Sequence, residues 1–176
     1  MTEAPEREPV LARAITRVLF GVGGGIAGTV YGTIVAMATL TAAYATQKQP
    51  WRLAGIVASA AVVLWVAHLY AHGLSESIVK NRRLTRDELG ALFGRELGIL
   101  LAAAAPTAAL VLGALGVFHE TTAIWIALGV GLVTLAAEGI RFARLERLGP
   151  MGTVVAMAIN LALGLVVVAL KVLVAH

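Results

Sequence analysis

The stretch Trp65-Val-Ala-His68-Leu-Tyr-Ala-His72-Gly-Leu-Ser-Glu76 brings ionisable side chains into an otherwise apolar sequence. His68, His72 and Glu76 follow one another at intervals of four residues, so they share one face of an α-helix. Ionisable groups beside a membrane span are costly unless a packed helix bundle or a water-filled cavity receives them. The stretch therefore predicts a membrane helix with one polar face, and this face is the first candidate for a functional site.

Composition indicates the same class of protein for the whole chain. Of its 176 residues, 59% are hydrophobic and 14% are charged, and the mean hydropathy is +0.87, whereas soluble domains are about 45–50% apolar. The sequence thus predicts an all-α integral membrane protein. The net charge of +4 does not indicate a nucleic-acid partner, because basic residues that flank apolar spans act as topology determinants. Cysteine is absent, which excludes disulfides and thiolate metal ligands.

Apolar segments long enough to cross a bilayer core of ~30 Å occur five times in the chain. We expect residues 1–17 to be a disordered or interfacial tail and residues 18–176 to form a single membrane domain. The second helix is predicted to extend beyond its apolar part to Asn81. The next helix is predicted to start at Thr85, because Thr85-Arg-Asp-Glu88 has the form of a capping box. The predicted spans cover about residues 18–44, 53–73, 97–117, 121–140 and 151–172.

Lysine and arginine are distributed unevenly between the two sides of such a bundle. Eleven of them fall on the side of the N-terminus and three on the side of the C-terminus. Basic residues favour the cytoplasmic side of a membrane. We therefore predict that the N-terminus is cytoplasmic and the C-terminus external, in a plasma membrane or bacterial inner membrane. The same bias argues against an antiparallel dimer of inverted copies.

Glycines in the first span predict close helix packing. Gly24, Gly28 and Gly32 recur every fourth residue, and a ridge without side chains lets another helix approach closely. The partner helix is expected either in the same bundle or in a second copy of the chain, as in a homo-oligomer. A phosphate-binding loop is excluded, because no strand precedes these glycines and no Lys-Ser/Thr follows them. Pro106, inside the third span, is predicted to kink its helix.

The predicted topology brings the scattered ionisable groups to one level in the cytoplasmic half of the bundle. At the helix ends, an ordinary layer of charged residues is the simpler interpretation. His68 lies deeper, where a hydrogen bond to a backbone carbonyl is the alternative to a functional role. The candidates for a proton, cation or metal site are His68, His72, Glu96 and Glu138, with Glu76, Arg95 and Asn160 as secondary candidates.

Three interpretations of these candidates remain open. A proton or cation channel or transporter fits the residue types, because histidine titrates near neutral pH. A non-catalytic membrane scaffold or partner subunit requires only the lipid bilayer and a neighbouring protein. An intramembrane site for zinc or another divalent metal is the third, since histidines four residues apart can share a metal. No cofactor is required and no catalytic residues are predicted, because Leu69 stands where a zinc protease has its glutamate.

Two short patterns carry a resemblance to known sequences. They are Trp65-x-x-His68-x-Tyr70 and the stretch from Asn160-Leu-Ala-Leu-Gly164 to Ala169-Leu-Lys171. In these and in its overall pattern the chain resembles small uncharacterised integral membrane proteins of high-GC bacteria. The resemblance covers most of the chain and implies the membrane location, but it implies no activity.

Overall fold

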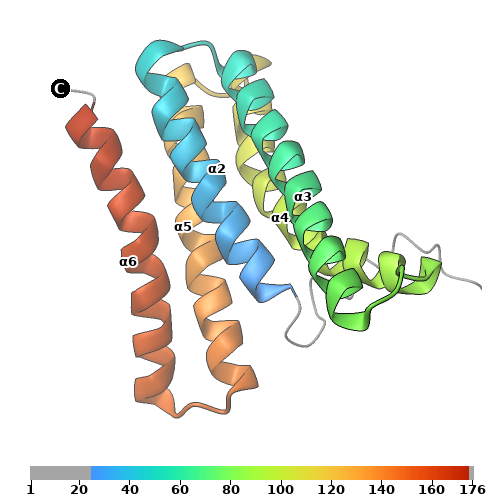
Figure 1. Ribbon diagram of the computed structural model, residues 1–176. Helices are drawn as coiled ribbons and strands as arrows, with labels where there is room; N and C mark the ends of the chain where they lie inside the picture. Colours follow the sequence, from blue (N-terminus) through green and yellow to red (C-terminus); the bar gives the residue numbers. More distant parts are fainter. Residues whose placement is uncertain (1–24, 175–176) are drawn as a thin grey trace, which may run out of the picture.

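The structure is a computed structural model that describes residues 25–174, with side chains described as far as residue 169. This part of the chain forms five long helices, each long and apolar enough to cross a membrane (Figure 1). The predicted all-α bundle of five helices is confirmed, and the chain is a multi-pass membrane protein. The N-terminal tail, Gly24 and the predicted start of the first span lie outside the described residues. The helices are α2 (Ile26–Thr46), α3 (Pro50–Lys80), α4 (Arg86–Ala114), α5 (Glu120–Leu145) and α6 (Pro150–Val174).

The helices run alternately up and down, and α2 and α5 form the centre, between α3 and α6 (Figure 1). Helices α2 and α5 each contact all of the other four, whereas α4 packs against α2, α3 and α5. Helices α3 and α6 lie on opposite sides of this centre and, within the described residues, do not touch each other. The connections 81–85 and 146–149 lie at one end of the bundle, and we call this end the basic end because it carries Arg82, Arg83, Arg86, Arg144 and Arg147.

Helix α4 starts where the sequence predicts. The Thr85 hydroxyl accepts a hydrogen bond from the Glu88 backbone N–H (3.3 Å), and the Glu88 carboxylate accepts one from the Thr85 N–H (2.8 Å). Both halves of the capping box are therefore formed, and they satisfy two backbone donors that a helix start leaves unpaired. The predicted extension of α3 is also confirmed, because this helix continues to Lys80 and ends at Asn81 in the left-handed conformation (φ 48°).

The glycines of α2 lie against α4 of the same chain. A Cβ built on Gly32 would lie 2.8 Å from the Ile99 carbonyl oxygen, and one built on Gly28 would lie 3.6 Å from Ile99 Cγ1. Gly98 of α4 faces back, with its Cβ position 3.0 Å from the Gly25 carbonyl oxygen. Small residues on both helices thus permit this close contact. Because Gly32 is buried against α4, this glycine does not offer a face for a second copy of the chain.

Helix α4 ends before the predicted limit at residue 117. Gly116 has a positive φ of 79°, and the N–H of Val117 donates to the carbonyl of Leu112 (3.0 Å). A left-handed glycine with this bond is a common helix stop, so α4 ends at Ala114. Pro106 is buried inside α4, and the kink at this residue stays a prediction.

The orientation of the bundle in the membrane is a testable prediction. Reporter fusions at the two termini should place the N-terminus in the cytoplasm and the C-terminus outside, because five helices put the termini on opposite sides and the basic end should stay in the cytoplasm. Alkaline phosphatase should be active only at the C-terminus, and green fluorescent protein should fluoresce only at the N-terminus. Termini on the same side would contradict a five-span topology.

Candidate functional site

An acid and a histidine from adjacent helices form the centre of the site. His72 of α3 and Glu96 of α4 approach to 2.9 Å between Nδ1 and Oε1. The Glu96 side chain is 7% exposed, whereas that of His72 is 47% exposed. The carboxylate is thus held inside the bundle, and the imidazole connects it to the surface. This contact can carry a proton, because a carboxylate both attracts a protonated imidazole and accepts its hydrogen bond.

Arg95 links this pair to a second acid. Its Nε lies 3.2 Å from Glu96 Oε1, and its Nη1 lies 3.3 Å from Glu76 Oε1. Glu96 therefore accepts from two basic groups through one oxygen, which satisfies a buried charge that would otherwise be costly. Glu76 and Arg95, which the sequence offered only as secondary candidates, belong to the same cluster as His72 and Glu96.

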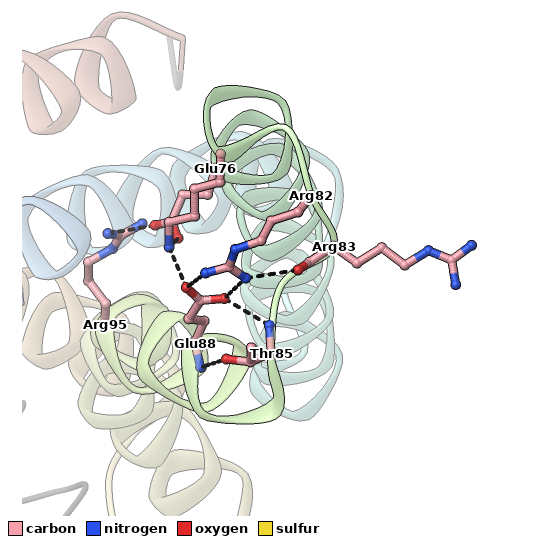
Figure 2. Close-up of polar contacts among 7 residues, drawn as sticks. Glu76, Arg82, Arg83, Thr85, Glu88 and Arg95 are labelled. Atoms are coloured by element: carbon pink, nitrogen blue, oxygen red, sulfur yellow. Dashed lines mark hydrogen bonds and ion pairs between the residues drawn. The ribbon is translucent and has the colours of Figure 1, made fainter.

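From Glu76 the ion pairs continue to the connection between α3 and α4, as Figure 2 shows. Lys80 Nζ lies 3.6 Å from Glu76 Oε2 and 2.8 Å from Glu88 Oε1. Arg82 binds both oxygens of Glu88, at 2.8 and 3.0 Å. These hydrogen bonds raise the pKa of the Arg82 guanidinium, so the pair stays ionised near neutral pH. Exposed ion pairs contribute little stability individually. Because these pairs join α3 and the connection after it to α4, we conclude that the network mainly fixes the orientation of α3 against α4.

A cavity of about 660 Å³ opens beside the His72–Glu96 pair. We call it the histidine cavity. His68 and Arg95 line it together with Ala27, Gly28 and Tyr31 of α2. The His68 ring lies 5.1 Å from the Tyr31 ring and 5.8 Å from the His72 ring, measured between centroids. Two titratable rings from one helix and a buried acid from the next thus face one shared space.

His68 also makes the backbone contact that the sequence left as its alternative role. Its Nδ1 lies 3.1 Å from the Leu64 carbonyl oxygen. A carbonyl only accepts, so Nδ1 carries the hydrogen, and in the neutral ring Nε2 is the acceptor. The backbone bond fixes the tautomer and leaves a proton-accepting nitrogen on the other side of the ring.

The other candidate residues lie elsewhere in the bundle. Glu138 is buried on α5, its Oε1 lies 3.4 Å from Arg141 Nη1 on the same helix, and it is not among the residues that line the histidine cavity. Asn160 of α6 donates to the Ala156 carbonyl (3.0 Å). Of the two acids that the sequence offered as partners for the histidines, the structure places Glu96 at His72 and Glu138 away from it.

The geometry does not favour a metal centre. Within residues 25–174, no three side chains of the types His, Asp and Glu come close enough together to hold a metal ion. Arg95 also competes for the one carboxylate beside His72, and metal sites need several ligands free to coordinate. The described residues therefore do not favour a site for zinc or another divalent ion.

Two residues of the site were missed by sequence reasoning. Tyr31 faces His68 from α2, and Glu88 joins the ion pairs of Lys80 and Arg82. No local pattern indicated Tyr31, because the helix that it faces depends on how α2 is rotated against its neighbours. Glu88 was visible only as a capping residue.

Comparison of the chain with known protein families, with curated proteins and with solved structures found no match.

Proposed function

We propose that this membrane protein transports protons, or a cation coupled to protons, and that the His72–Glu96 pair takes up and releases the proton. The single observation that carries the proposal is the 2.9 Å contact between a buried carboxylate and a half-exposed imidazole at the wall of a cavity. Histidine changes charge near neutral pH, and polar groups inside a membrane bundle mark ion pathways.

A proton suits this site better than a metal cation does. Proton exchange requires one donor and one acceptor within hydrogen-bond distance, and His72 and Glu96 meet that condition. The neighbouring guanidinium of Arg95 lies 3.2 Å from Glu96 and would repel a second cation. His68, at 5.8 Å from His72 between ring centroids, is the next proton-accepting group along α3.

Unpaired polar atoms support a continuation of the pathway away from the basic end. Trp65 Nε1, Thr107 Oγ1 and Thr41 Oγ1 are buried and have no hydrogen-bond partner among the described residues. Such groups are expensive inside a membrane unless water or a transported species bonds them. They lie on α3, α4 and α2 respectively, the three helices that line the histidine cavity. On this proposal the basic end faces the cytoplasm of a plasma or bacterial inner membrane.

The test compares proton flux in liposomes that contain wild-type protein or the variant His72→Ala. Flux should fall at least about 10-fold in the variant, a modest loss for removal of a proton-transfer group. His119→Ala is the matched control, because His119 is an exposed histidine at the other end of the bundle, and it should leave flux unchanged. Equal background flux in all three samples would exclude transport and favour a non-catalytic scaffold or partner subunit.

A further inference from the structure

A second cavity, of about 680 Å³, lies between α2, α5 and α6. It shares Ala27 and Tyr31 with the histidine cavity, and the proposed proton transfer does not use it. Its walls are mainly apolar, with Ile26 and Ile34 from α2 and Leu145 from α5. The volume falls within the range of about 300–1,000 Å³ that is typical of sites for small organic molecules.

Among the described residues that line this second cavity, Glu146 is the one charged side chain. Glu146 lines it, no lysine or arginine is among the lining residues, and Glu146 makes no ion pair with any residue in the described range 25–169. Asn160 Nδ2 donates one of its two N–H groups to the Ala156 carbonyl, and its amide oxygen is an acceptor. A carboxylate and an amide oxygen together favour a cationic or donating ligand.

Two aromatic rings complete the lining. Tyr31 and Phe142 are 45% and 44% exposed, and both contribute to the wall of the second cavity. The faces of aromatic rings attract cations, most strongly where water is excluded. An organic anion would be repelled by Glu146, and a neutral apolar molecule would gain nothing from that carboxylate.

We propose that the second cavity binds a lipophilic organic cation, with its charge at Glu146 and its apolar groups against Tyr31 and Phe142. Neither His72 nor Glu96 lines this cavity. The proposal assigns a ligand class to the cavity between α2, α5 and α6. Ala27 and Tyr31 are the two residues that line both this cavity and the histidine cavity.

Binding of tetraphenylphosphonium to the full-length protein in detergent micelles tests this site. Isothermal titration should show saturable binding to the wild type beyond the partitioning into empty micelles. Glu146→Gln should weaken the affinity at least 10-fold. Glu120→Gln, which alters an exposed acid at the opposite end of the same helix, should bind as the wild type does. The neutral analogue triphenylphosphine oxide should bind at least 10-fold more weakly than tetraphenylphosphonium to the wild type.

Two outcomes would overturn the assignment. One is equal affinity of wild type and Glu146→Gln for tetraphenylphosphonium, and the other is equal affinity of the wild type for the cation and its neutral analogue. His72→Ala should retain full binding, so failure of proton transport and failure of the cation site are distinguishable. Because Glu146 is exposed at the end of α5, its replacement by glutamine should leave folding intact, which circular dichroism can verify.

Discussion

Replacing Gly32 with alanine should strongly destabilise the bundle, although the change adds only one methyl group. The new Cβ would lie 2.8 Å from the Ile99 carbonyl oxygen and 2.9 Å from Ile99 Cα. Both are backbone atoms, so they cannot move aside as a flexible side chain could, and α2 and α4 would have to separate. Overpacking of this kind costs about 1–3 kcal/mol, and leucine at the same position should prevent the bundle from assembling.

Gly129→Ala is the matched control for Gly32→Ala. Gly129 also lies inside a helix, but a Cβ built there meets no atom within 4 Å. Alanine should therefore stabilise the protein by up to about 1 kcal/mol, because glycine is a poor helix former. Thermal unfolding in detergent, followed by size-exclusion chromatography, should show the two midpoints moving in opposite directions. Equal midpoints would mean that α2 and α4 do not approach each other this closely.

Glu96→Gln should cause the largest loss of proton flux of any conservative substitution. Glutamine keeps the shape of the side chain but removes the negative charge that His72 and Arg95 share. We expect flux in liposomes to fall about 100-fold, within the range for removal of a general acid or base. Stability should change little, because Arg95 keeps its contact with Glu76 and the half-exposed His72 can bond water instead.

Glu138→Gln is the control that shows whether neutralising any buried acid in the bundle lowers proton flux. Glu138 is also buried on a membrane helix, yet its partner is Arg141 and it does not line the histidine cavity. If the pathway runs through that cavity, flux in this variant should equal that of the wild type. A loss of flux for Glu138→Gln with none for Glu96→Gln would indicate a pathway along α5 and contradict proton transfer at the His72–Glu96 pair.

The features that the sequence predicts correctly are those that depend on residues close together in the chain. The capping box of Thr85 and Glu88 needs only a three-residue spacing, and the extension of α3 needs only the polar stripe after His72. Five apolar segments of membrane length define the five helices in the same way. Each of these is a property of one helix, and helix periodicity is sufficient to recognise it.

Contacts between helices were predictable only in part. Both Glu96 and Glu138 were possible partners for His72, because the sequence places them at a similar depth without fixing how far each helix is rotated about its axis. Rotation and register depend on side-chain packing across the whole bundle, such as the fit of Gly32 against Ile99. That fit also decides that Tyr31 faces His68, and no local pattern contains this information.

The close contact of α2 with α4 determines which parts of the bundle can move. The two helices cannot rotate against each other without losing the Gly32–Ile99 contact, so they form a stationary frame. Helix α6 touches only α5 and α2, and α3 and α6 are not in contact with each other in the described part of the chain. The histidine cavity is lined by both helices of this frame and by α3, and the ion pairs of Lys80 and Arg95 hold α3 against α4. The second cavity instead has α6 in its wall, so a shift of α6 would change the second cavity and leave the histidine cavity as it is.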